Sequence, residues 1–515
     1  MSRSTAVPAE GLRMGTPQGR WVLAATVLGS SLAMLDATVV NVALERIGAD
    51  LDAGFAGLQW TVNAYTLTLA ALILLGGSLS DRLGRRRVFV VGVCWFAAAS
   101  VLCGLAPDIG TLIAARALQG VGGALLTPGS LAIIAASFSG DDRAAAVGAW
   151  SGFGGVAGAV GPFLGGWLVE WNWRAVFLLN VPVAVLVVVV AARHVPESRD
   201  PAAAPRLDWL GTALVALGLG ALTYALTTAA DPGAGVWAWG AVGVVALLAF
   251  AVVQRRSRNP LVPPALFRKA QFTGANLVTF LVYAALGVFF VLVVLHLQVV
   301  SGFSPLLAGT ALLPVTVLML LFSSRVGAIA QRTGPRAFLV GGPLLAAVGV
   351  LLVRRVGPGA SYLVDVLPAV VVFGAGLTLL VAPLTATVLD SAPDGAAGVA
   401  SGVNNAVARA AGLLAVAVVP VAAGIGGADY TDPEAFAAGF RTAMLICAGL
   451  LVAGSLLAVV FIRPLPTGPE PAAVGEPTTA GPAPRIRVEE CPHCPVTGPP
   501  VHPRTGAAVP RGSAT

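Results

Sequence analysis

The sequence predicts an all-α membrane protein, and its composition, its apolar stretches and an internal repeat support this fold class. Of the 515 residues, 57% are hydrophobic and 11% are charged, whereas a soluble domain carries about 25% charged residues. A chain this apolar cannot shield its surface from water, so the bilayer is the expected solvent. The polar N-terminal stretch lacks the apolar core of a signal peptide.

Fourteen apolar stretches follow one another along the chain, and each is close to the length of about 20 residues that a transmembrane helix needs. We therefore expect fourteen membrane-spanning helices. The expected spans are residues 21–44, 58–79, 88–106, 109–138, 145–168, 175–193, 209–229, 236–254, 272–297, 304–324, 337–353, 362–388, 398–425 and 438–462.

The loops between these spans differ in charge, and this difference predicts the orientation in the membrane. With fourteen spans, both termini lie on the same side. The tails and loops of that side contain 24 of the 31 Lys and Arg residues, and the opposite loops contain five. Basic residues accumulate in cytoplasmic loops, so we expect both tails in the cytoplasm. The net charge of +7 follows from this bias and does not indicate nucleic-acid binding.

Short motifs recur about 250 residues apart. "GSLSDRLGRRRV" (77–88) matches "GAIAQRTGPRAF" (327–338), and "GAWSG" (148–152) matches "GVASG" (398–402). A duplicated six-helix bundle explains this spacing and places the substrate site between the halves; chance similarity of Gly- and Ala-rich helices is the alternative. The expected parts are a cytoplasmic N-tail (1–20), an N-terminal six-helix bundle (21–195), two inserted transmembrane helices (207–254), a C-terminal six-helix bundle (272–462) and a disordered cytoplasmic C-tail (463–515).

These motifs resemble those of the major facilitator superfamily, and within it the fourteen-helix drug:proton antiporters. "GSLSDRLGRRRV" resembles the signature loop after helix 2, "LDATVVNVAL" (35–44) the helix-1 motif, "RALQGVGGA" (116–124) the helix-4 motif and "GGVAGAVGPFLGG" (154–166) the antiporter motif of helix 5. The resemblance covers most of residues 21–462. It implies a major facilitator fold and a proton-coupled exporter of small amphipathic molecules, such as drugs or antibiotics, that works by alternating access.

Other functions fit the sequence less well or equally well. Export of an endogenous metabolite fits the same features, whereas the helix-5 motif argues against a solute importer. A polytopic membrane enzyme would need a catalytic acid pair or a metal site on an outer loop, and the outer acids form no such motif. A Walker lysine motif is missing, so ATP is not the expected energy source. We expect a monomer without cofactor, whose partners are a small-molecule substrate, protons and lipid.

Gly154, Gly158, Gly161 and Gly165 are spaced by four, three and four residues, so they share one face of a helix. A face without side chains lets a neighbouring backbone approach closely, and Pro162 permits a bend. We expect this face to pack across the two halves and to slide or rock during turnover. Ordinary small-residue packing is the alternative.

Asp36 is the only acid well inside the apolar spans of the first half. A buried carboxylate costs several kcal/mol unless it is paired or protonated, so such a group can bind and release a proton as its surroundings alternate. Arg116 is the expected partner, because both residues lie about 10 to 12 Å from the outer ends of their helices. Arginine keeps its proton, so Arg116 would tune Asp36. A static ion pair that fixes packing is the alternative.

The loop after the second span contains glycines that allow tight turns and an acid that can accept hydrogen bonds from arginine. In the resembling family this loop holds the two halves together at the cytoplasmic face. Simple positive-inside topology is the alternative for its arginines. The expected residues are Gly77, Asp81, Arg82, Gly84, Arg85 and Arg86.

Weaker candidates are aromatic and polar residues within the spans, which could line a substrate pocket. Aromatic stripes more often face lipid or the core, and Arg409 could instead bind a backbone carbonyl. These candidates are Trp60, Tyr65, Trp150, Tyr283, Asn404 and Arg409. In the C-tail, Cys491 and Cys494 with two histidines are zinc-ligand types, but a second cysteine pair is missing, so we predict no metal site.

Overall fold

The computed structural model describes residues 12–200, 207–228, 235–257, 260–392, 397–426 and 432–463. In these ranges the regular elements are helices, which confirms the predicted all-α fold class. The chain divides into two units, Met1–Pro464 and Leu465–Thr515. The second unit, which includes Cys491 and Cys494, lies outside the described residues.

The first half of the chain supplies a group of neighbouring helices, which we call the N-group. Helices α2, α3 and α4 pack together, and α1 packs against α4, α5 and α7. The N-group consists of α1 (Pro17–Asp50), α2 (Phe55–Leu83), α3 (Arg85–Gly104), α4 (Ile109–Ser137), α5 (Gly140–Trp171), α6 (Ala175–Leu178) and α7 (Asn180–His194).

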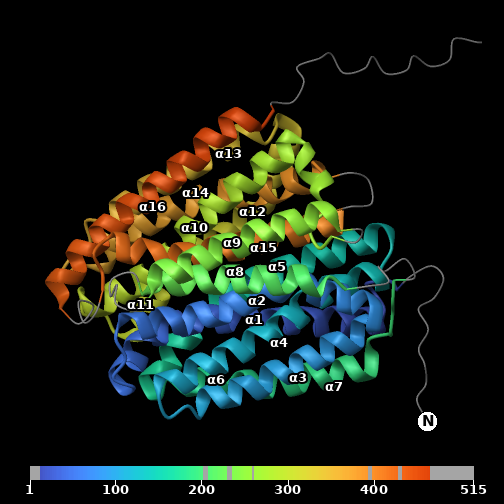
Figure 1. The fold of residues 1–515 in the computed structure, drawn as a ribbon, viewed down its shortest axis with the longest axis horizontal. Coiled ribbons are helices and arrows are strands. Elements are labelled where there is room, and N and C mark those ends of the chain that lie inside the picture. Colours follow the sequence, from blue (N-terminus) through green and yellow to red (C-terminus); the bar gives the residue numbers. More distant parts are fainter. Residues whose placement is uncertain are drawn as a thin grey trace, which may run out of the picture. The chain divides into compact units, whose positions relative to one another are not determined.

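The second half supplies a corresponding C-group, in which α10 packs on α15 and α16, and α14 packs on α12 and α13. Figure 1 shows the N-group in blue to green and the C-group in yellow-green to red. The C-group consists of η1 (Pro264–Arg268), α10 (Ala270–Val299), α11 (Pro305–Thr310), α12 (Leu313–Thr333), α13 (Arg336–Val353), η2 (Tyr362–Val366), α14 (Leu367–Asp390), α15 (Ala397–Ala422) and α16 (Pro433–Phe461).

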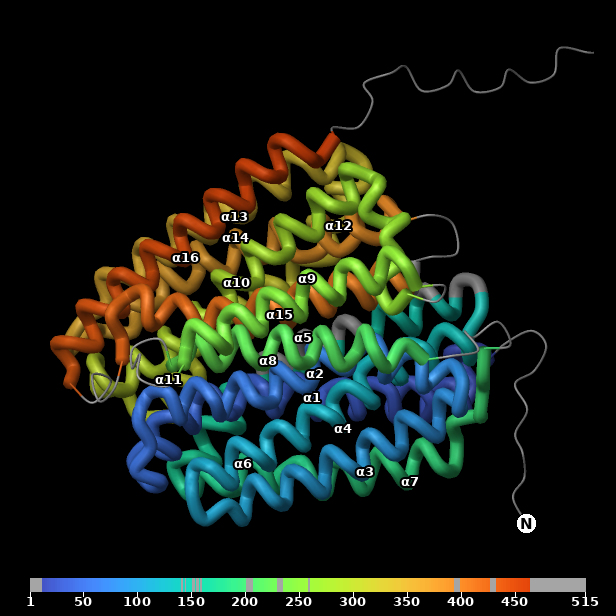
Figure 2. Tube along the Cα trace, in the orientation of Figure 1, coloured from blue at the N-terminus to red at the C-terminus, as the bar shows by residue number. Residues whose placement is uncertain are grey.

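Two further helices come between these groups in the sequence. Helices α8 (Trp209–Thr227) and α9 (Val236–Arg256) pack on each other, and α8 also contacts α2 of the N-group and α15 of the C-group. The tube in Figure 2 follows this order from blue through green to red. Helix α8 therefore lies against both groups.

The helices match the predicted membrane spans. Thirteen helical segments in the described ranges are long and apolar enough to cross a membrane. Helix α5, with 32 residues, lies where the fifth span was predicted and is not among the thirteen. Helix α5 and these thirteen segments together correspond to the fourteen spans that the sequence predicts. The sixth span is made of α6 and α7, which meet at Leu179.

Local sequence explains where several helices begin. Helices α1, α11 and α16 each begin with proline at the first helical position. A backbone N–H at this position has no acceptor within the helix, so proline, which lacks the N–H, is tolerated there. Asp108 caps α4 by accepting the backbone N–H of Thr111 at 2.9 Å and its hydroxyl at 2.7 Å. These hydrogen bonds, led by the hydroxyl, hold the pKa of Asp108 below its usual value.

The predicted repeat is visible in the backbone. Gly84 ends α2 with φ of 116°, and Gly334, 250 residues later, ends α12 with φ of 95°. The repeat extends to helix contacts: a Cβ at Gly92 would lie 3.2 Å from the carbonyl oxygen of Gly122, and one at Gly342 would lie 3.0 Å from that of Gly376. The pairs α3–α4 and α13–α14 thus approach closely in the same way.

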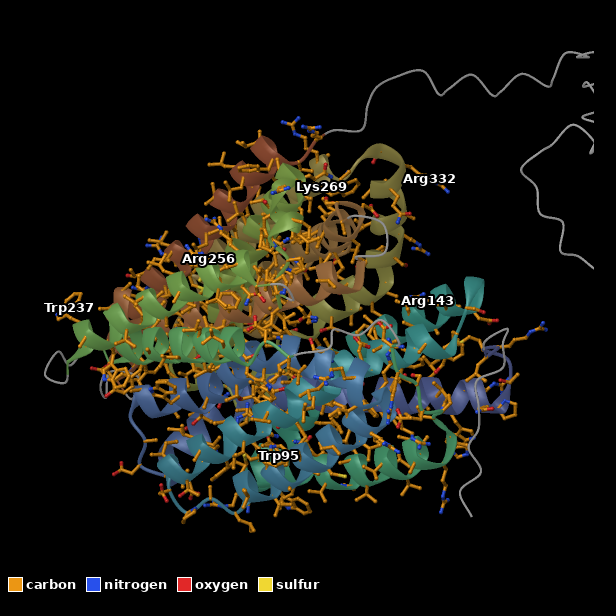
Figure 3. The ribbon with its side chains drawn as sticks, turned by 45° about the vertical axis from the view of Figure 1, so that its right-hand side comes forward. Trp95, Arg143, Trp237, Arg256, Lys269 and Arg332 are labelled. Atoms are coloured by element: carbon orange, nitrogen blue, oxygen red, sulfur yellow. The ribbon has the colours of Figure 1, made fainter. Side chains whose placement is uncertain are left out.

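Arginines and tryptophans mark the two ends of the helices. Arg143 at the start of α5 and Arg332 at the end of α12 lie at one end, and Trp237 at the start of α9 lies at the opposite end (Figure 3). The charge bias of the sequence predicts that the first end faces the cytoplasm. We refer to these as the basic end and the outer end.

The positive φ of Gly334 gives a test of the repeat geometry. Gly334→Ala should destabilise the protein by about 1 to 3 kcal/mol, because a residue with a Cβ is strained in this region. The measurement is the thermal unfolding midpoint of purified protein. The control is Gly341→Ala, since no atom lies within 4 Å of a Cβ there and its backbone is helical. Equal midpoints for the two variants would contradict the strained turn.

Candidate functional site

Asp36 and Arg116 form an ion pair inside the N-group, as the sequence predicts. Asp36 lies on α1 and Arg116 on α4, and they are 2% and 1% exposed. The Arg116 guanidinium donates through Nη1 to Asp36 Oδ2. Because both charges are out of contact with water, each depends on the other for its stability.

The second carboxylate oxygen of Asp36 accepts hydrogen bonds from two buried amides. Gln119 on α4 donates from Nε2 at 2.7 Å, and Asn180 at the start of α7 donates from Nδ2 at 3.0 Å. Both amides also donate to the hydroxyl of Ser100 on α3, at 2.8 and 3.2 Å. Asp36 is therefore held in place by an ion pair and by hydrogen bonds together.

Arg116 connects this cluster to α2. Its Nε donates to the carbonyl oxygen of Thr61 at 3.0 Å, and its Nη1 also donates to Gln119 Oε1 at 2.6 Å. The guanidinium lies 4.4 Å from the centre of the Tyr65 ring, within the range of a cation–π contact. The Tyr65 hydroxyl donates to the carbonyl oxygen of Ala33 on α1 at 3.4 Å. The cluster thus joins α1, α2, α3, α4 and α7.

Three residues of this cluster were not predicted from the sequence: Ser100, Gln119 and Asn180. Gln119 lies one helical turn after Arg116, so its position on the same face was a usable signal. Ser100 and Asn180 lie on helices whose contact with α1 and α4 depends on tertiary packing. Sequence spacing does not contain that information.

The loop between α2 and α3 is fixed by the segment that follows α7. Asp81 accepts from Nε and Nη2 of Arg85 at 3.0 and 2.9 Å. The carboxylate of Glu197 accepts the backbone N–H of Arg86 at 3.1 Å and lies beside its guanidinium at 3.7 Å. The backbone N–H of Arg85 donates to the carbonyl oxygen of Ser198 at 2.9 Å.

Glu197 was not predicted, and its carboxylate lies against Gly84, where glycine is required by the positive φ of 116°. A Cβ at Gly84 would lie 2.6 Å from Glu197 Oε1. Gly77 lies near Pro128 of α4, and Arg82 is exposed. The hydrogen bonds and ion pairs of Asp81, Arg85 and Arg86 in the described chain are therefore within the N-group and its following segment. The expected role of this loop in holding the two halves together stays a prediction.

The structure describes the surroundings of two of the four glycines on the predicted face of α5. Cβ atoms at Gly161 and Gly165 would meet Thr38 and Val39 of α1, so these glycines pack within the N-group. The prediction that they pack across the two halves is therefore wrong. The surroundings of Gly154 and Gly158 lie outside the described part of the chain.

A neighbouring face of α5 makes the contact with the other group. A Cβ at Gly166 would lie 2.5 Å from Leu306 Cα and 2.8 Å from the carbonyl oxygen of Pro305, both on α11. The carbonyl oxygen of Pro162 approaches Gly309 of the same helix. Residues 162 and 166 lie one turn apart, so they share a face that differs from that of Gly161 and Gly165.

The six weaker cavity candidates do not gather in one place. The Trp60 ring lies 6.4 Å from that of Tyr224 on α8, and Trp150 donates to Ser30 of α1 at 2.9 Å. Asn404 donates to Asn276 and Thr279 of α10, at 3.2 and 2.8 Å. Trp60, Trp150 and Asn404 therefore make separate helix contacts, and Tyr65 belongs to the Asp36–Arg116 cluster.

Two glutamines join the groups near the outer end. Gln59 on α2 donates to the carbonyl oxygen of Val416 on α15 at 2.7 Å, and Gln298 on α10 donates to that of Val42 on α1 at 3.2 Å. Apolar side chains such as Leu44, Leu58 and Leu292 pack beside them. This conformation is therefore closed between α1, α2, α10 and α15 at the outer end.

A sequence profile of the Major Facilitator Superfamily matches residues 26–417. The chain belongs to this superfamily. Its solved relatives share the fold: a POT family transporter in complex with 5-aminolevulinic acid has a TM-score of 0.66 at 16% identity, covering 88% of this chain and 98% of the other. A bacterial homolog of the human lysosomal transporter Spinster has a TM-score of 0.61 at 17% identity, covering 87% and 97%.

Several relatives are more similar to this chain in sequence than these solved structures are. The chain is 36% identical over 482 residues to a puromycin resistance protein of Streptomyces alboniger, covering 89% of this chain and 94% of the relative. It is 35% identical to a probable actinorhodin transporter of Streptomyces coelicolor, covering 78% and 72%. It is 38% identical to a multidrug efflux pump of Mycolicibacterium smegmatis, covering 66% and 68%.

Metal-ligating side chains do not cluster in this superfamily member as far as the structure describes it. Within the described ranges, His, Cys, Asp and Glu side chains form no group of three that could hold a metal ion. The acid in the candidate site, Asp36, is instead paired with arginine and amides.

The contact of α5 with α11 gives a second test. Gly166→Leu should prevent this close approach and lower the rate of substrate transport by about tenfold or more, because transport requires the closed outer end to form. The control is Gly148→Leu on the same helix, where no atom lies within 4 Å of a Cβ. Both variants would be reconstituted at matched protein amounts, and equal flux through them would contradict the role of this contact.

Proposed function

We propose that this superfamily member is a proton-coupled exporter of small amphipathic molecules such as drugs or antibiotics. It works by alternating access in the cytoplasmic membrane, as a monomer with both termini in the cytoplasm, and it catalyses no covalent chemistry. The observation that carries the proposal is the buried Asp36–Arg116 pair with its amide donors. The names of the resistance and efflux relatives support export as the direction of transport.

Asp36 is the proton-carrying group in this proposal. In the ionised state its carboxylate is bound by Arg116, Gln119 and Asn180, which lie on α4 and α7. Protonation removes the negative charge that these donors share and frees α1 to shift relative to α4 and α7. A proton entering from outside therefore changes helix packing at the point where α1, α4 and α7 meet, and its release to the cytoplasm restores the pair.

Arg116 tunes this step without carrying the proton. Its guanidinium stays charged at physiological pH, and its bonds to Thr61 and Gln119 keep it in place when Asp36 is neutral. The cation favours the ionised carboxylate. Arg116 thus sets the pH range over which Asp36 loads and releases its proton.

Asp36→Asn separates proton coupling from substrate movement. Asn retains the shape but cannot ionise, so export driven by an imposed pH gradient should fall to the level of empty proteoliposomes. Exchange of labelled for unlabelled substrate without a gradient should persist, since it needs no net proton transfer. The control is Asp365→Asn, an exposed acid that accepts the backbone N–H of Ser361. Gradient-driven export by Asp36→Asn at the wild-type rate would overturn the assignment.

Arg116→Ala should change the pH dependence of export. Without the cation, Asp36 keeps only its amide donors Gln119 and Asn180, so the pH optimum of efflux should differ from that of the wild type. Arg116→Lys retains a positive charge and should return the optimum toward that of the wild type. Efflux from proteoliposomes is measured from acidic to basic pH at a constant pH difference. The same optimum for all three proteins would rule out tuning by Arg116.

A further inference from the structure

Arg409 lies on the face of α15 that meets the N-group. Val416, seven residues after it, accepts the hydrogen bond from Gln59 of α2. A Cβ at Gly402, seven residues before it, would lie 3.2 Å from the side chain of Leu74, also on α2. Seven residues are close to two helical turns, so these three positions share one face. Arg409 is therefore on the seam between the groups, midway between two contacts with α2.

The guanidinium of Arg409 interacts electrostatically with phenol groups from both groups. One belongs to Tyr65 on α2, and the other to Tyr283 on α10. The Tyr65 hydroxyl in turn bonds to α1 at Ala33. Arg409 thus lies in the seam where α15 packs against α2 and α10. Asn405, one turn closer to the basic end on the same face of α15, is exposed.

Arg409 has no counter-ion in the structure as described. Its guanidinium forms none of the ion pairs or hydrogen bonds found among the described residues. Asp36 is not the counter-ion of Arg409, because its two carboxylate oxygens already accept hydrogen bonds from Arg116, Gln119 and Asn180. A permanent charge at this depth in a membrane protein is costly and marks a substrate or ion pathway. The space beside Arg409 therefore has an unneutralised positive charge.

Asn63 supplies a second polar group on the same seam. It lies one turn from Gln59 on the face of α2 that meets α15. The side chain is fully buried, and neither its oxygen nor its nitrogen has a hydrogen-bond partner within the described chain. A buried amide without partners is costly. Asn63 therefore offers a free donor and a free acceptor in the same seam as the free cation of Arg409.

We propose that Arg409, assisted by Asn63, binds a negatively charged group of the exported molecule. The ligand class is an amphipathic anion with a carboxylate or an acidic phenol, which a guanidinium binds through charge-assisted hydrogen bonds. Tyr283, which is half-buried, provides a ring face for its apolar part. Because Asp36 and Arg116 neutralise each other, Arg409 leaves the space with a net positive charge that disfavours cations. This inference rests on the proposed export function and names its substrate class.

Two dyes with one scaffold and opposite charges test this selectivity. Fluorescein is an anion and rhodamine 123 is a cation, and both contain the same xanthene ring system. Binding is measured by fluorescence anisotropy with the purified full-length protein, and export with proteoliposomes under a pH gradient. Wild type should bind fluorescein more tightly than rhodamine 123. Arg409→Gln should weaken fluorescein binding by about tenfold or more and leave rhodamine 123 binding equal or tighter.

The control variants separate charge from folding. Arg409→Lys keeps the charge and should retain most of the fluorescein affinity, and Arg354→Gln removes an exposed arginine and should change neither dye. Asn63→Leu should weaken fluorescein binding less than Arg409→Gln does. Unchanged fluorescein binding by Arg409→Gln, or equal loss of both dyes, would overturn the inference.

The two readouts also distinguish this inference from the export proposal. Tight, Arg409-dependent fluorescein binding without gradient-driven export would support the anion site and refute proton-coupled export of this dye. Export of rhodamine 123 with fluorescein neither bound nor exported would refute the anion site and leave export standing.

Discussion

A carboxylate at membrane depth has to be neutralised, and the packing of the N-group depends on how Asp36 meets this requirement. Its oxygens take donors from α4 and α7, and those donors are themselves tied to α2 and α3. Removing one partner from a buried ion pair typically costs about 3 to 5 kcal/mol. The positions of five helices are therefore coupled to the charge of one group, so a single proton can change their packing.

Glycine provides the complementary constraint, because it determines where helices approach each other closely. At Gly122 and Gly349 a Cβ would lie within 3 Å of the neighbouring helix backbone, at Phe96 and Phe373 respectively. These contacts are inside a group and make it rigid. The contact of Gly166 with α11 is instead between groups. Small residues thus serve both rigid packing within the groups and a separable interface between them.

The sequence was sufficient for features that depend on local pattern or on a single strong cost. Hydropathy located the helices, and most of their ends, to within a few residues, although α1 continues to Asp50 and α12 to Thr333, beyond the predicted 44 and 324. The cost of a lone buried charge identified Asp36 and Arg116 as partners. Features that depend on tertiary packing were missed or misplaced. The seven glycines between 152 and 167 do not reveal which face of α5 meets which neighbour, and nothing in the sequence places Glu197 beside the loop between α2 and α3. Asn180 is one asparagine among several until α7 packs beside α1.

The N-group and the C-group meet along two seams, α2–α15 and α5–α12, and helix α8 covers only the first. It contacts both α2 and α15, and its exposed side chains Trp209, Leu210 and Leu217 are apolar, as expected for a surface in contact with acyl chains. The α2–α15 seam is thus screened from the bilayer by a third helix. At the other seam the bulky apolar side chains Phe153 on α5 and Phe322 on α12 are themselves exposed. Acyl chains of the bilayer therefore reach the α5–α12 seam directly, whereas α8 separates them from the α2–α15 seam, so the inserted pair makes the lipid-facing perimeter asymmetric.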